Sequence, residues 1–148
     1  MLEKSRQRMI DGVNKMSGRA NCGEAVPLQQ RSRAAVLALG IAFVVVMTAV
    51  SLAVDFGPIV AGGIAGLVVG GGINLLSTTY WLGYCDGEIF LVKTNRLGNK
   101  PVELTAHYTY PVPSSPSSGF LVKRVQIAGA DYLVAKQFEE RMRSIIGT

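Results

Sequence analysis

Two long stretches without charged residues constrain this chain more than any other feature of its sequence. Residues 34–54 and 56–85 contain no Asp, Glu, Lys or Arg, although the 148-residue chain carries 15 Lys+Arg and 10 Asp+Glu. A helix of about 20 apolar residues spans the roughly 30 Å hydrocarbon core of a bilayer. A buried helix of a water-soluble protein seldom stays apolar around its whole circumference for so long. We therefore predict a membrane protein with spans at 34–54 and 59–79.

The short connection between the two predicted spans determines their topology. Residues 55–58 contain Asp, Gly and Pro, which favour a turn. Because so few residues cannot cross a bilayer, the spans form an antiparallel hairpin and both termini lie on one side. All 15 Lys and Arg residues flank the hairpin, so the positive-inside rule places both termini in the cytoplasm. The expected location is the cell (inner) membrane, as a multi-pass protein.

The chain is thus divided into three parts. Residues 1–33 are a cytoplasmic N-terminal amphipathic segment and linker, 34–84 are the transmembrane helical hairpin with an interfacial end at 80–84, and 85–148 are a cytoplasmic β-rich domain. In this last part, residue patterns predict strands at 88–93, 101–108, 120–127 and 132–135 and a C-terminal helix at 136–146. The predicted fold class is a two-helix transmembrane hairpin followed by a small cytoplasmic α+β domain, an antiparallel sheet plus one helix.

The N-terminal segment is expected to contact lipid. Residues 1–20 place apolar side chains on one helical stripe and basic ones elsewhere, which is typical of an amphipathic helix lying on anionic lipid. The alternative is a mostly disordered tail, because two glycines interrupt the pattern and short helices are marginal in water. Residues 21–33 read as a linker that brings Arg31 and Arg33 to lipid headgroups.

Small residues recur in the second predicted span. Gly62, Gly66 and Gly70 are spaced four residues apart, which lets helix backbones approach closely. This glycine face is expected to pack against the alanine-rich stripe of the first span, and it can also pack against another copy or another subunit. Asn74 either hydrogen-bonds across the helix interface or lines a conducting path.

Aromatic side chains follow the second span directly. Tyr80, Trp81 and Tyr84 combine apolar rings with polar tips, and such residues are enriched at the headgroup level of membranes. We predict that they anchor the hairpin at the interface.

Side chains suited to catalysis or metal binding are scarce. His107 is the only histidine, and Cys22 and Cys85 are the only cysteines, so a zinc site would lack ligands. Because both cysteines fall on the predicted cytoplasmic, reducing side, we expect no structural disulfide. Basic residues are interspersed with acidic ones, which disfavours nucleic-acid binding. The prediction is a protein that is not an enzyme, with no catalytic or metal site, no cofactor and no nucleic-acid partner.

A family resemblance begins where the second span ends. The segment WLGYCDGEIFLVK at 81–93, followed by RLGNKP at 96–101, resembles the opening hairpin of small bacterial two-span membrane proteins with a pleckstrin-homology-like cytoplasmic domain. The resemblance covers residues 81–146 and implies contact with lipid or protein rather than catalysis. Domains of that type have more strands than the four predicted here. Either the sheet is truncated, or a partner or second copy completes it.

These features together favour an assembly role. The chain is expected to be a non-enzymatic accessory or assembly subunit of a larger membrane complex, with membrane lipids and either other membrane-protein subunits or further copies of itself as partners. One alternative is a holin-like homo-oligomeric membrane pore. Another is a membrane-tethered module that senses a lipid or ligand.

Overall fold

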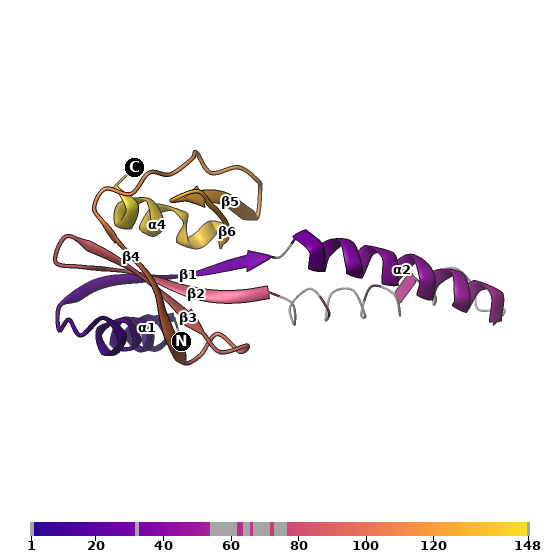
Figure 1. The fold of residues 1–148 in the computed structure, drawn as a ribbon, viewed down its shortest axis with the longest axis horizontal. Helices are drawn as coiled ribbons and strands as arrows, with labels where there is room; N and C mark the ends of the chain where they lie inside the picture. The colour runs from indigo at the N-terminus through magenta and orange to yellow at the C-terminus, as the bar shows by residue number, and fades with distance from the viewer. Residues whose placement is uncertain are drawn as a thin grey trace. The chain divides into compact units, whose positions relative to one another are not determined.

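A computed structural model of the protein describes residues 2–31, 33–53, 62–63, 66, 72 and 77–147, with the side chains of its long apolar helix described over 36–49. The chain forms two compact units. Unit 1 contains residues 1–30 and 78–148, and unit 2 contains residues 31–77. In the order of the chain, unit 2 is therefore an insertion within unit 1, and the colour bar of Figure 1 allows both to be followed.

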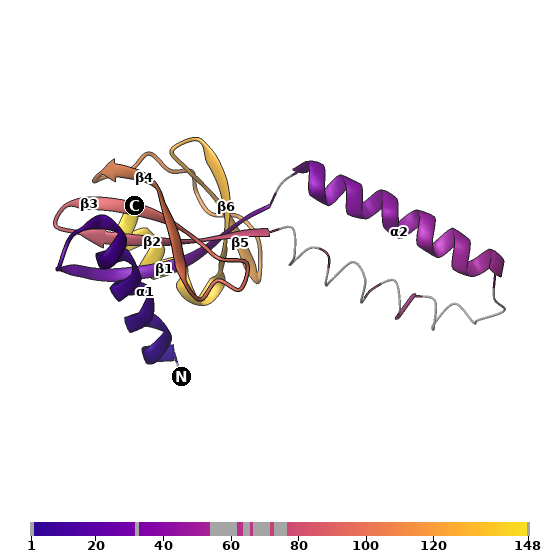
Figure 2. The same ribbon diagram turned by 60° about the horizontal axis from the view of Figure 1, so that its bottom comes forward.

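Unit 1 is built on one six-stranded sheet with the strand order β4-β3-β2-β1-β6-β5. The strands β1 and β2 lie side by side although the whole of unit 2 separates them in sequence (Figure 2). The pairs β1–β6, β2–β3, β3–β4 and β5–β6 are antiparallel. The elements are α1 (Leu2–Ser17), β1 (Cys22–Arg31), α2 (Arg33–Ala53, in unit 2), β2 (Ser77–Cys85), β3 (Glu88–Thr94), β4 (Pro101–Thr109), β5 (Val122–Ile127), β6 (Ala130–Ala135), the short 3₁₀ helix η1 (Lys136–Phe138) and α4 (Glu139–Ile146).

Two tight turns set the register of the hairpins β2–β3 and β5–β6. Asp86 and Gly87 connect β2 to β3 with φ angles of 50° and 83°, and Ala128 and Gly129 connect β5 to β6 with φ angles of 48° and 84°. Positive φ at both turn residues is the type I′ geometry, whose twist matches that of the strands it joins. Asp-Gly is a preferred sequence for this turn, so the β2–β3 hairpin follows from local sequence.

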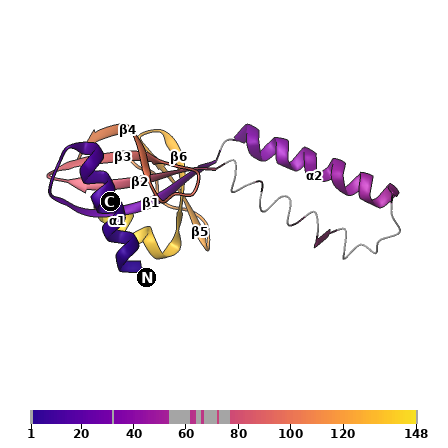
Figure 3. The same cartoon turned by 90° about the horizontal axis from the view of Figure 1, so that it is seen from below.

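One face of the sheet is covered by α1 (Figure 3). The buried side of this helix consists of Met9, Ile10 and Val13, which pack in one cluster with Trp81 and Phe90 of the sheet. Trp81 is only 1% exposed. Burial of each large apolar side chain contributes about 1.5–3 kcal/mol, so α1 belongs to the core of unit 1.

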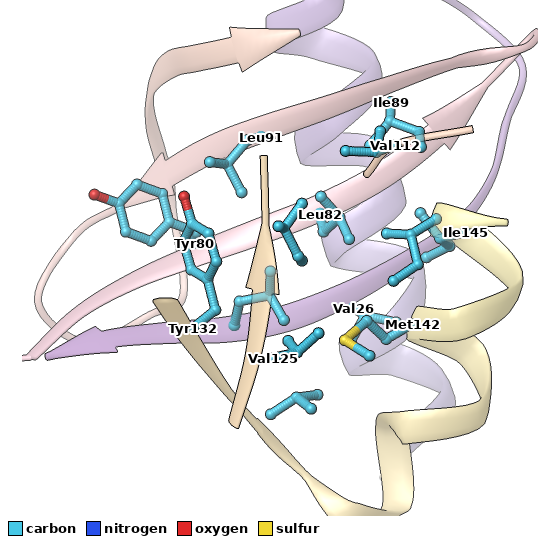
Figure 4. Packing of buried hydrophobic residues seen from close by; sticks show 14 residues of the cluster. Val26, Tyr80, Leu82, Ile89, Leu91, Val112, Val125, Tyr132, Met142 and Ile145 are labelled. Carbon is cyan, nitrogen blue, oxygen red and sulfur yellow. The ribbon is translucent and has the colours of Figure 1, made fainter. Parts of the chain in front are cut away.

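The opposite face of the sheet carries the larger core (Figure 4). Met142 and Ile145 of α4 meet Val26 and Leu82 from the central strands there. Tyr80 and Tyr132 lie edge to face with ring centroids 5.9 Å apart, an arrangement that aromatic quadrupoles favour. Since β2 sends Leu82 to this face and Trp81 to the other, the central strand is buried on both sides.

The predicted fold class is wrong. Within the residues that the structure describes, no helix is both long enough and apolar enough to cross a membrane. The transmembrane hairpin at 34–54 and 59–79 and the multi-pass location in the cell membrane with cytoplasmic termini are therefore not supported. Part of the reason lies in the charge-free stretch 56–85, because its last nine residues are a strand and their apolar side chains are packed in the sheet.

The sheet also includes two segments that we did not expect to be strands. Most of 21–33, expected to be a linker, forms β1, and the residues expected at the membrane interface, 80–84, lie in β2. The four strands predicted beyond residue 85 appear as β3 to β6, and the predicted C-terminal helix appears as η1 and α4. The helix predicted within 1–20 is α1, with its apolar stripe against the sheet rather than free for lipid.

Cys22 and Cys85 form a disulfide bond, so the expectation that no structural disulfide exists is wrong. That expectation rested on an assumed reducing compartment and not on geometry. The bond joins the first residue of β1 to the last residue of β2, at the end of this strand pair opposite to the insertion of unit 2. Both cysteines are buried.

Candidate functional site

The most unusual surface of the molecule is the apolar helix α2. Leu37, Ile41, Val44 and Val45 are between 60% and 68% exposed. Their spacing of i, i+4, i+7 and i+8 places them on one helical face. A stripe of four large aliphatic side chains is uncommon on a free protein surface and is typical of an interaction site.

The one polar side chain described on this helix makes its hydrogen bond within the helix. The hydroxyl of Thr48 donates a hydrogen bond to the carbonyl oxygen of Val44 at 2.8 Å, so its donor is already used. No charged residue occurs in 34–54. A complementary surface must therefore be apolar, because a charge buried against this stripe would remain unpaired.

Open glycine backbone accompanies the apolar stripe in unit 2. A Cβ atom at Gly40, Gly62 or Gly66 would meet no described atom within 4 Å. At Gly72, by contrast, a Cβ atom would lie 2.6 Å from Cδ2 of Leu39, so that position packs against α2. Gly62 and Gly66, two of the residues predicted for helix packing, therefore have open space where a Cβ atom would lie, whereas Gly70 and Asn74 lie outside the described residues.

The predicted interfacial anchors have a different role in the structure. Tyr80 and Trp81 are buried in β2, on opposite faces of the sheet, and Tyr84 is half-buried with its ring edge-on to Tyr110. Their mixed polar and apolar character suits a protein core as well as a membrane interface. Arg31 is exposed at the end of β1, and Arg33 is the first residue of α2.

A polar network in unit 1 escaped the sequence analysis. Ser117 donates a short hydrogen bond to the carboxylate of Glu139, and Arg143 Nη2 lies 2.9 Å from Oε1 of the same carboxylate. The hydrogen bond from the Ser117 hydroxyl lowers the pKa of Glu139, and Arg143 and the charge of Lys123 lower it further. Partial burial of the carboxylate raises its pKa and so opposes this shift. The contacts hold the loop before β5 to α4. Only the i, i+4 spacing of Glu139 and Arg143 is visible in sequence.

Groups that could form a metal centre are absent from the described part of the chain. His107 lies on β4, where it stacks on Phe90 with ring centroids 5.6 Å apart and approaches Glu88 at 3.7 Å. In the described part of the chain, His107 therefore contacts an aromatic ring and a carboxylate.

No family model, curated protein or solved structure matches this chain. The resemblance of residues 81–146 to pleckstrin-homology-like domains therefore stays a prediction.

Proposed function

We propose that this protein is a non-enzymatic accessory subunit that assembles with a different protein through α2. The observation that carries the proposal is the exposed stripe of Leu37, Ile41, Val44 and Val45. Anchors at i, i+4 and i+7 are the pattern by which amphipathic helices bind hydrophobic grooves of partner proteins. Burial of a fully exposed side chain of this size contributes up to about 1.5–3 kcal/mol, so the stripe is the main source of apolar binding free energy on α2.

The open glycines favour helices as the partner's contacting elements. A glycine whose missing Cβ would meet nothing leaves space for a second backbone, and Gly40 and Gly66 both offer such space. Close backbone approach increases the van der Waals contact between helices. The expected partner surface is therefore an apolar groove between helices, without charged side chains at its floor.

The proposal is tested with the full chain and a matched pair of variants. Affinity purification under mild conditions should recover a second protein at a fixed ratio, and the two purified components should then rebind. Leu37→Glu should weaken that rebinding more than tenfold, because a carboxylate would be buried without a counter-charge. Leu121→Glu is the control, since Leu121 is 71% exposed but lies in unit 1. Gly66→Leu should also weaken rebinding.

Three outcomes would contradict the proposal. Equal rebinding by the Leu37→Glu and Leu121→Glu variants would remove α2 from the interface. Formation of a single species that contains only this chain would indicate self-association instead. Binding of the purified chain to protein-free phosphatidylcholine vesicles, with no protein partner at a fixed ratio, would indicate that the stripe contacts lipid.

A further inference from the structure

A cavity of about 330 Å³ opens on unit 1, and no residue of unit 2 lines it. Its walls come from five separate parts of the chain: α1, β1, β2, the turn between β3 and β4, and the segment η1–α4. Cavities of about 300 Å³ and above accommodate small-molecule ligands. Because all these parts belong to unit 1, the cavity is a feature of a single folded body.

Three arginines contribute to the wall, and no acidic residue does. Arg6 and Arg8 come from α1, and Arg141 comes from α4. Arg6 makes a long ion pair, in which the Nη2 atom of Arg6 lies 3.8 Å from the Oε1 atom of Glu24. In the described part of the chain, neither Arg8 nor Arg141 makes an ion pair within 4.0 Å. Guanidinium groups bind carboxylate and phosphate oxygens in pairs of parallel hydrogen bonds, so this wall is suited to an anion.

The remaining wall is largely apolar. Met9, Trp81 and Phe138 line the cavity, and Leu97 lines it while remaining 81% exposed. A large aliphatic side chain so exposed at the rim of a cavity loses its contact with water when an apolar ligand group covers it. The neutral polar side chains of the lining are Ser5, Asn99 and Gln137.

We infer that this cavity binds a small organic anion that carries a phosphate or carboxylate group on an aromatic or aliphatic body. The oxyanion is held by Arg8 and Arg141, with Arg6 contributing once it leaves Glu24. The apolar body lies against Phe138 and Leu97. This inference is independent of the proposed function, because no lining residue belongs to unit 2.

Trp81 provides a direct probe of the cavity. It is the only tryptophan of the chain and lines the cavity wall, so ligand binding should change the intrinsic fluorescence. The full chain is titrated with phenyl phosphate and with benzoate, and in parallel with inorganic phosphate and with benzyl alcohol. We expect at least one of the two organic anions to bind at least tenfold more tightly than inorganic phosphate and than benzyl alcohol. Inorganic phosphate lacks the apolar body, and benzyl alcohol lacks the anionic group.

Two variants assign the binding to the arginine wall. Arg141→Gln should weaken binding about tenfold, and Arg124→Gln, an exposed arginine on β5 outside the cavity, should leave it unchanged. Circular dichroism checks that both variants are folded, and Arg8→Gln replaces Arg141→Gln if the latter is not. Equal affinity in the two variants would overturn the inference. It would also be overturned if neither organic anion changed the Trp81 fluorescence at about 10 mM, or if neither bound more tightly than inorganic phosphate.

Discussion

Gly12 of α1 lies directly against the indole of Trp81, so that a Cβ atom at residue 12 would be 2.9 Å from Cε3 of the ring. A real Cβ atom essentially never approaches so closely. The glycine therefore serves close packing of a helix on a sheet, and not the interruption of a helix that its sequence position suggests. A similar contact occurs at Gly83, where a Cβ atom would lie 2.6 Å from a methyl carbon of Val13.

The first prediction follows from this contact. Gly12→Ala should lower the free energy of unfolding, because overpacking typically costs about 1–3 kcal/mol while the better helix propensity of alanine returns only about 1 kcal/mol. Urea unfolding followed by Trp81 fluorescence measures the change. The control is Gly23→Ala on β1, where a Cβ atom would meet nothing within 4 Å. A Gly12→Ala protein more stable than wild type would show that α1 moves off Trp81 without cost.

The second prediction concerns the bond between Cys22 and Cys85. The two residues are 63 positions apart, and for a loop of that length the chain-entropy model gives a stabilisation of about 4 kcal/mol. We expect the double variant Cys22→Ser/Cys85→Ser to unfold at a markedly lower urea concentration than the oxidised wild type. Adding a reductant should bring the wild type close to the variant and leave the variant unchanged. Identical unfolding midpoints with and without reductant would contradict this.

The third prediction uses the lowered pKa of Glu139. A carboxylate with a lowered pKa in the folded state stabilises the fold above its ordinary pKa of 4.5, and this contribution is lost as the pH falls through the lower folded value. Glu139→Gln should therefore reduce stability at about pH 7, and the difference from wild type should shrink below about pH 4. Urea midpoints at several pH values test this. Glu140→Gln, at the exposed neighbouring position, is the control, and a gap that stayed constant with pH would refute the electrostatic origin.

The fourth prediction concerns which segments are needed for folding. Residues 85–148 lack β1 and all but the last residue of β2, and these are the two central strands of the sheet. This fragment should be unfolded by circular dichroism and by amide proton dispersion in NMR spectra. A chain in which a short turn replaces the insertion and joins 1–30 to 78–148 should fold, because it retains both cores. A folded 85–148 fragment would mean that the sheet does not depend on its centre.

Local signals in the sequence were sufficient for part of this fold. The β-rich run at 88–93 predicted β3, the alternating residues at 101–108 predicted β4, and the helical stripe containing Met9 and Val13 predicted α1. These signals succeed because each depends on neighbours a few residues away. A stripe does not reveal what covers it, however, and for α1 the cover is the sheet and not lipid.

Long-range pairing explains what the sequence did not reveal. The strand β1 finds its neighbours in β2 and β6, across the insertion and near the C-terminus, and its mixed polar composition reads locally as a linker. The aromatic residues Tyr80 and Trp81 suit an interface and a core equally well, so only the sheet decides between the two. The cavity arginines come from both ends of the chain, and nothing in their spacing indicates that they converge.

The placement of the disulfide has a mechanical consequence for whatever unit 2 binds. The chain enters the insertion from the end of β1 and returns from it at the start of β2, and these two strands are neighbours. A pulling force on the insertion therefore acts on the hydrogen bonds between β1 and β2 one after another, starting at the end next to the insertion. At the other end, the two strands are joined by the covalent bond between Cys22 and Cys85. Tension can open the strand pair from one end, but the two strands cannot be pulled fully apart while that bond is intact.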